Sequence, residues 1–173
     1  MNFCPDIFYR YAFSDKSFFK TLDFAIFDHD SNGVGHASEH AWSRVYLRSS
    51  ATTRFSNWSF RWEMKMFVYY NNSIADANKD IRKYTGFWNT RISFVNHTSD
   101  TEFLDRISMY LEFYPGGTYS TNFKYGAQEI GAKVRLGWGK FNPWLFVQIY
   151  HGYCESLIDY NKENFSYRIG IFF

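Results

Sequence analysis

Apolar and polar side chains alternate along most of this chain. The stretch WSFRWEMKMFVYY, residues 58–70, places an apolar or aromatic side chain at every second position. The intervening positions of its first half carry Ser59, Arg61, Glu63 and Lys65. A helix would scatter the apolar positions around its circumference, whereas a strand places them all on one face. The alternation therefore predicts a β-strand with one apolar face and one polar face.

The same period of two returns in several other segments, and no helical period of useful length interrupts it. Strands are predicted at residues 105–113, 129–138 and 165–173, and further strands around residues 6–13, 19–29, 40–50, 84–95 and 143–153. Turn-rich pieces separate these segments, and no linker or low-complexity tract divides the chain. We therefore expect a single all-β domain spanning residues 1–173, built as an antiparallel meander of eight or nine strands.

Two all-β architectures place the apolar face differently. A soluble sandwich or lipocalin-like barrel turns it inward, whereas a transmembrane β-barrel turns it toward lipid and encloses the charged face. The predicted strands, about 9–13 residues long, have the length that a tilted strand needs to cross a bilayer. Aromatic residues gather near the strand ends, as at membrane interfaces, and they include Trp42, Trp58, Tyr69, Tyr70, Trp88, Trp138 and Trp144. These features favour an antiparallel transmembrane β-barrel with a charged network inside, formed by Arg61, Glu63, Lys65, Lys133 and Arg135.

Composition narrows the classes of function. The 173 residues suffice for one domain with a sizeable core, and 23% of them are aromatic. No run of about 18 apolar residues occurs, which excludes a transmembrane helix. The net charge of +2, without any basic run, argues against a nucleic-acid partner. Cys4 and Cys154 lie at opposite ends of the chain, and their spacing leaves both a disulfide and two free thiols open.

The stretch DHDSNGVGHASEH, residues 28–40, allows two interpretations. Five residues match positions 1, 3, 5, 6 and 12 of an EF-hand calcium loop, and they are Asp28, Asp30, Asn32, Gly33 and Glu39. In the other interpretation, His29 and Ser31 are a base and a nucleophile on one face of a strand. An EF-hand needs a helix on each side, but both flanking segments are predicted to be extended. A soluble calcium-binding module therefore stays only as an alternative hypothesis.

His29 and Ser31 project to the same face of the predicted strand, because one residue separates them. That face also carries Ala25 and Phe27, so we expect it to point toward lipid. In the following strand, Ser43 falls on the apolar face as well. Polar side chains on a lipid-facing surface are costly and mark functional sites. These three polar residues are therefore the candidate catalytic group.

Four segments of the sequence resemble one known family, the outer-membrane phospholipase A of Gram-negative bacteria. The segments are HDSNG (29–33), AWSRVYLR (41–48), KYTGFW (83–88) and GYCESLIDYN (152–161). The resemblance covers essentially the whole chain and keeps the order of the segments. It implies a twelve-stranded barrel, of which this chain corresponds to roughly the C-terminal two-thirds. We therefore expect a chain that lacks the N-terminal strands of the family.

The resemblance also implies a mechanism and a setting. Ser31 would attack an acyl ester carbonyl of a phospholipid, and His29 would accept its proton and return it to the leaving alcohol. The backbone N–H of Gly33, together with Ca²⁺, would stabilise the oxyanion. The family uses an asparagine as third catalytic residue where this sequence has Ser43, so we expect weakened catalysis. The implied protein is a calcium-dependent phospholipase with A1, A2 and lysophospholipase activity, located in the outer membrane and active as a homodimer.

The implied calcium ligands depart from the family as well. Val34 matches a position that supplies a backbone carbonyl, and Glu39 matches a serine ligand. Asp76 lies beside the position of a family aspartate, which is Ala77 in this sequence. A Ca²⁺ ion bound by Val34, Glu39 and Asp76 is thus an expectation from the resemblance. The departures leave another hypothesis open, namely a catalytically weak or inactive barrel with a structural or pore role.

Overall fold

The computed structural model describes residues 4–33, 39–70, 74–96, 104–117, 122–137 and 142–172. The strands in these ranges are β1 (Asp6–Ala12), β2 (Phe19–Ser31), β3 (Ala41–Phe55), β4 (Trp58–Tyr69), β5 (Trp88–Asn96), β6 (Leu104–Gly116), β7 (Asn122–Leu136), β8 (Trp144–Gly152) and β9 (Asn164–Phe172). A 3-10 helix, η2 (Asp76–Asn78), and a short α-helix, α1 (Arg82–Thr85), lie between β4 and β5. No helix in the described ranges is long and apolar enough to cross a membrane.

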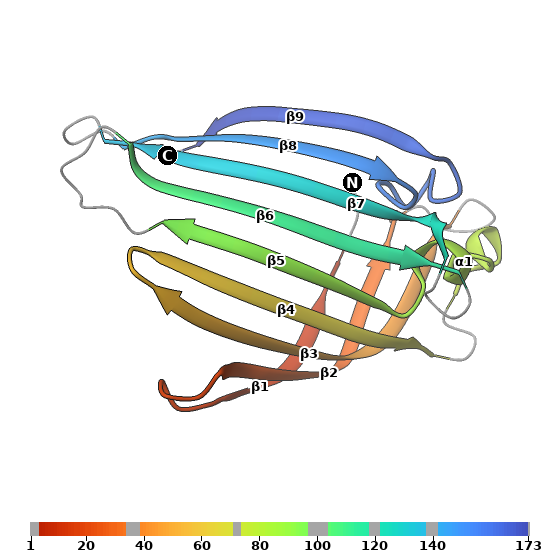
Figure 1. Cartoon of the computed structure of the whole chain (residues 1–173). Helices are drawn as coiled ribbons and strands as arrows, with labels where there is room; N and C mark the ends of the chain where they lie inside the picture. Colours follow the sequence, from red (N-terminus) through yellow and green to blue (C-terminus); the bar gives the residue numbers. More distant parts are fainter. Residues whose placement is uncertain are drawn as a thin grey trace.

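Each strand pairs with its neighbour in sequence, and every pairing is antiparallel. The strands therefore follow one another in the order β1 to β9 around one curved sheet (Figure 1). Within the described residues β1 and β9 form no ladder with each other, so the sheet is open. The predicted antiparallel all-β meander is confirmed, with nine strands in the described part of the chain. The predicted strand start at residues 84–87 is wrong, because α1 and the turn after it occupy this segment.

The outer face of the sheet is apolar and exposed. Side chains of neighbouring strands meet there side by side, as Ile130, Ile149 and Tyr167 do across β7, β8 and β9. All three are exposed, and Ile169 on β9 reaches 77%. A soluble domain would bury such a row of large apolar side chains. The exposed apolar face agrees with the predicted transmembrane barrel, in which this face meets lipid.

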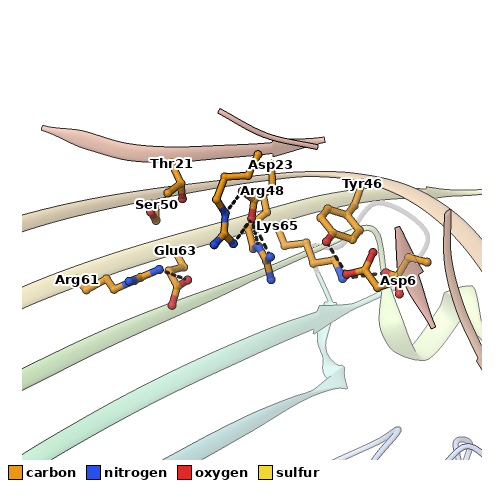
Figure 2. A network of polar contacts seen from close by, with 11 residues as sticks. Asp6, Thr21, Asp23, Tyr46, Arg48, Ser50, Arg61, Glu63 and Lys65 are labelled. Atoms are coloured by element: carbon orange, nitrogen blue, oxygen red, sulfur yellow. Dashed lines mark hydrogen bonds and ion pairs between the residues drawn. The ribbon is translucent and has the colours of Figure 1, made fainter. Parts of the chain in front are cut away.

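The inner face carries the charges, as the alternation predicts. Asp23 on β2 is 1% exposed and accepts hydrogen bonds from Arg10 at 2.7 Å and Arg48 at 2.8 Å. Arg61 and Glu63 on β4 form an ion pair of 2.9 Å. Figure 2 shows these contacts gathered on one side of the sheet. Pairing offsets the cost of removing these charges from water, so the network is part of what holds the strands together.

A cluster of buried side chains lies at the end of the sheet next to α1, on the right in Figure 1. Its buried members are Ala25, Trp42, Tyr46, Phe67, Tyr69, Ile81, Tyr84, Leu157 and Tyr160. The rings of Trp42 and Tyr69 make a T-shaped contact with centroids 5.8 Å apart. The prediction that these two rings lie at the membrane interface is therefore wrong, because their positions face inward. Trp138, another ring of that prediction, lies outside the described residues.

Strand β2 contains a β-bulge that changes which residues face outward. Ala25 pairs with Tyr46 and Asp28 pairs with Arg44, so two residues of β2 lie opposite one residue of β3. The alternation of side chains slips by one residue at this point. Ala25 is consequently buried against Tyr46 on the inner face. The expectation that Ala25 shares the outer face with His29 is wrong.

Candidate functional site

His29 and Ser43 lie directly opposite each other on β2 and β3. The bulge has reset the alternation, so both side chains leave the sheet on its outer face. Asp28 and Arg44 beside them form an ion pair of 2.7 Å on the inner face. The Nδ1 atom of His29 lies 2.9 Å from Oγ of Ser43, across a sequence separation of 14 residues. Strand pairing thus joins two of the three predicted catalytic residues.

Two contacts hold the ring of His29 in one orientation. The ring stacks on Phe27, with centroids 5.9 Å apart and an interplanar angle of 10°. Its Nδ1 side faces Ser43. Because the second ring nitrogen lies on the other side of the imidazole, a ring bound through Nδ1 leaves Nε2 to act on another group. Ser31 follows two residues later on the same face, opposite Ala41 of β3.

The chain turns immediately after Ser31. Gly33 has a φ of +67°, a left-handed conformation that glycine adopts without steric cost. Its backbone N–H donates a hydrogen bond to Oγ of Ser31 at 3.3 Å. A backbone amide therefore lies beside the candidate nucleophile, where it could stabilise negative charge on a nearby oxygen. The structure thus places all four predicted catalytic and oxyanion residues at one end of the β2–β3 pair.

Two asparagines to which the sequence analysis gave no catalytic role hold the start of β3. Oδ1 of Asn32 accepts the backbone N–H of His40 at 3.1 Å, and Oδ1 of Asn78 accepts that of Ala41 at 3.3 Å. Both asparagines are buried. The backbone N–H groups of two consecutive residues beside Ser31 thus donate to side-chain oxygens. One of these oxygens comes from the turn after β2 and the other from η2. No local pattern marks Asn78, because its contact spans 37 positions.

The structure describes two of the three expected calcium ligands. Glu39 is exposed just before β3, and Asp76 is exposed as the first residue of η2. Val34 lies outside the described residues. In the ranges that are described, no group of three His, Cys, Asp or Glu side chains could hold a metal ion. Exposed carboxylates are nevertheless the oxygen donors that Ca²⁺ prefers, so the donor chemistry of Glu39 and Asp76 fits this ion.

The EF-hand interpretation of residues 28–40 is wrong. The segment is flanked by β2 and β3, whereas an EF-hand loop is flanked by helices. Asp28, which would be its first ligand, lies 2.7 Å from Arg44 and 2.8 Å from Lys65 on the inner face. Its carboxylate is therefore already neutralised by two cations.

Cys4 and Cys154 are both free thiols. Burial and the hydrogen bond from Sγ of Cys4 to Asp30 raise the pKa of Cys4 to about 11. Burial raises the pKa of Cys154 to about 12. Because the thiolate is the reactive form, both thiols are poor nucleophiles near neutral pH. Ser31 therefore stays the candidate nucleophile at this end of the sheet.

Comparison with known proteins places these residues in a family context. The family model described as Phospholipase A1 matches residues 1–173. Phospholipase A1 of Escherichia coli strain K12 is 31% identical over 145 residues, which are 84% of this chain and 43% of that protein. Phospholipase A1 of Proteus vulgaris is 26% identical over 172 residues, which are 98% of this chain and 52% of that protein. The chain thus spans about half the length of these curated relatives.

Solved structures share the fold. Outer membrane phospholipase A from Escherichia coli matches with a TM-score of 0.65 and 26% identity, over 98% of this chain and 59% of that one. An outer membrane phospholipase dimer with bound calcium from Salmonella typhi matches with a TM-score of 0.68 at 24% identity, over the same shares of the two chains. The β-barrel fold predicted from the alternation is the fold of these proteins. A family match along the entire sequence, joined to this shared fold, shows that the chain belongs to the phospholipase A1 family.

Proposed function

We propose that this chain is an outer-membrane phospholipase that hydrolyses acyl ester bonds of phospholipids, with A1, A2 and lysophospholipase activity. The observation that carries the proposal is the 2.9 Å contact between Nδ1 of His29 and Oγ of Ser43. Ser31 lies on the same outer face, two residues from His29. In this proposal the nine strands span the outer membrane as one domain, residues 1–173.

The outer face next to the catalytic group suits the acyl chains of a phospholipid. Exposed apolar side chains lie on β2, β3 and β4 toward the middle of the sheet from this group, among them Phe24, Ile26, Leu47 and Val68. Ser31 is the last residue of β2, so it lies at the level where a membrane-spanning strand ends. Ester groups of a phospholipid occupy that level, between the acyl chains and the headgroups. A lipid packed along this face could therefore present its ester carbonyl to Ser31.

In the proposed reaction, Oγ of Ser31 attacks the ester carbonyl carbon while Nε2 of His29 takes its proton. Nδ1–H of His29 donates to Oγ of Ser43, which holds the ring and stabilises the positive charge that the imidazole gains. Nε2 then returns the proton to the oxygen of the leaving alcohol, so the acyl chain stays on Ser31. Water deprotonated by the same nitrogen frees the fatty acid and restores the serine.

The oxyanion of the tetrahedral intermediate would accept a hydrogen bond from the N–H of Gly33, which lies next to Oγ of Ser31. The carboxylates of Glu39 and Asp76 and the backbone carbonyl of Val34 are the groups that would hold Ca²⁺. When bound, this ion would supply positive charge beside the oxyanion. The Salmonella typhi relative is a dimer with bound calcium. We extend both partners to this chain, namely Ca²⁺ and a second copy of the chain.

One observation favours a second function, a barrel without catalytic activity that serves a structural or pore role. The partner of His29 is the hydroxyl of Ser43, where the family resemblance implies an asparagine. A hydroxyl is shorter than a carboxamide, and its orientation is less fixed by the side chain. The ring of His29 would then be held less firmly, which lowers the rate.

The test compares two serines of the same outer face. The wild-type chain, Ser31→Ala and the matched control Ser49→Ala are folded into micelles, and folding is checked by heat-modifiable gel mobility. Fatty-acid release from a micellar phospholipid is measured with and without added Ca²⁺. We expect hydrolysis by wild type and Ser49→Ala, and a loss of about a thousandfold or more in Ser31→Ala. Hydrolysis that survives in Ser31→Ala, or its absence in folded wild type with Ca²⁺, would contradict the proposal, and the second outcome would favour the non-catalytic barrel.

A further inference from the structure

A cavity of about 440 Å³ opens on the inner face of the sheet. It lies at the end opposite to α1, on the left in Figure 1, where β3 ends and β4 begins. Its wall contains four cations and one carboxylate, namely Arg54, Arg61, Arg91, Lys133 and Glu63. Hydroxyl groups line much of the remaining wall, and they belong to Thr52, Ser59, Ser93, Ser108 and Tyr110. Guanidinium, ammonium and hydroxyl groups donate hydrogen bonds, and phosphate oxygens accept them.

Within the described residues, two of these four cations form an ion pair with a carboxylate, and two do not. Arg61 forms an ion pair of 2.9 Å with Glu63, and Figure 2 draws the two side chains pointing toward each other. Arg91 lies 3.2 Å from a carboxylate of β6. No carboxylate of the described residues forms an ion pair with Arg54 or with Lys133, whose ammonium lies 5.0 Å from the centroid of an aromatic ring. The cavity therefore holds two positive charges that this part of the chain does not neutralise.

The positive charge continues toward the nearby turns. A neighbouring cavity of about 920 Å³ shares Arg54 and Arg61 with the first one. It adds Lys16 and Lys20, against the carboxylate of Asp15. Since two arginines belong to both cavities, the surplus charge forms one continuous surface at this end of the sheet.

A further observation shows that the surplus is local. At the end next to α1, by contrast, a cavity of about 320 Å³ has Arg44 and Arg168 against three carboxylates. The inner face is therefore electrically polarised, with its positive end far from the catalytic group.

We propose that the cavity lined by Arg54 and Lys133 binds a phosphate group, either as inorganic phosphate or as part of a lipid headgroup. A phosphate anion would neutralise the two unmatched cations. Charge-assisted hydrogen bonds from a guanidinium and an ammonium, together with the serine hydroxyls, would give it direct contacts. This site lies on the opposite face and at the opposite end from Ser31, so it goes beyond the proposed hydrolase and does not depend on it.

The experiment uses the full chain folded in zwitterionic micelles. Titration calorimetry at constant ionic strength measures the binding of inorganic phosphate, of glycerophosphoglycerol as a headgroup without acyl chains, and of chloride. The variants are Arg54→Gln, Lys133→Gln and the double variant, with Lys162→Gln as a matched surface control that also removes one cation. Each cavity variant is expected to weaken phosphate binding about tenfold, because it removes one charged hydrogen-bond donor. Lys133→Arg keeps the charge and is expected to keep the binding.

The two ligands separate the possible sources of phosphate. Binding of both means that the cavity recognises the phosphate group itself, whereas binding of one alone identifies a free anion or a headgroup. If phosphate binds no more tightly than chloride, the cavity is a solvated cationic surface without a phosphate site, and the proposal is overturned. Equal phosphate affinity in the wild type and the folded double variant would overturn the proposal as well. If the double variant does not fold, the two single variants and Lys133→Arg decide the question in the same way.

Discussion

Replacing Ser43 with alanine removes the 2.9 Å hydrogen bond that it forms with Nδ1 of His29. The ring becomes positively charged in the proposed transition state, and a hydrogen bond to a charged group contributes about 1.5–3 kcal/mol. Each 1.4 kcal/mol changes a rate about tenfold, so Ser43→Ala should lower kcat by roughly 10- to 150-fold. Both residues are only partly buried, which favours the lower end of this range.

Ser43→Asn should act in the opposite direction. An asparagine carries a planar carbonyl acceptor on a longer side chain, so it can hold the imidazole in a better-defined orientation than a hydroxyl does. Because the site lies on the exposed outer face, the larger side chain does not have to enter a packed core. We expect kcat to rise several-fold above wild type, with little change in KM, because the contact acts on His29 and does not bind substrate.

The assay measures initial rates of fatty-acid release from a micellar phospholipid, with Ca²⁺ present, for both variants and for Ser49→Ala. Ser49 lies on the same strand and face as Ser43 but pairs with Leu22 and Met64, away from His29. Its replacement should leave the rate within a factor of about two, as expected for a surface substitution. A kcat of Ser43→Ala equal to that of wild type, or a lower kcat in Ser43→Asn, would refute the role assigned to this residue.

Three further predictions concern the charge network around Asp23, the proposed Ca²⁺ site and the start of β3. Asp23→Asn should lower the free energy of unfolding by about 2–3 kcal/mol, because it removes the buried charge that neutralises Arg10 and Arg48. Denaturant unfolding followed by tryptophan fluorescence checks this. Glu39→Ala should weaken Ca²⁺ binding in calorimetry, and a chain that binds no Ca²⁺ before or after the change would dismiss the calcium site. Asn78→Ala leaves the N–H of Ala41 without its acceptor, so kcat should fall about tenfold at unchanged KM. The neighbouring exposed Lys79→Ala is its control, and an equal effect of both changes would exclude a positioning role for Asn78.

The strands could be predicted from sequence because each one alternates by itself. The segment 58–70 shows this best, since β4 runs from Trp58 to Tyr69. The residues that close the end of the sheet could not be predicted in the same way. Helix α1 has four residues, fewer than one amphipathic repeat needs, and Tyr84 packs against rings from other parts of the chain. Such a packing arrangement leaves no periodic trace in the local sequence.

The same distinction between local patterns and long-range contacts applies to the candidate site. His29, Ser31 and Ser43 could be found because their motif and their alternation are local, and antiparallel pairing then brings the two strands together. Asn78 could not be found, because its role arises only when η2 folds back onto the first residue of β3. Candidate catalytic residues were thus visible in the sequence, whereas a residue that holds the start of β3 was not.

The bulge in β2 explains why His29 shares a face with Ser43 although Ala25 does not. Strict alternation from the inward Asp23 and Ala25 would turn His29 inward as well and leave Asp28 on the apolar outer face. One extra residue between Ala25 and Asp28 reverses this order, so Asp28 meets its cations inside and His29 meets Ser43 outside. The extra residue is Ile26, which has no partner on β1 or β3 and is exposed on the outer face. An irregularity of one residue therefore decides whether the candidate catalytic group lies on the outer or the inner face of the sheet, and bulges are known to re-aim side chains in this way next to active sites.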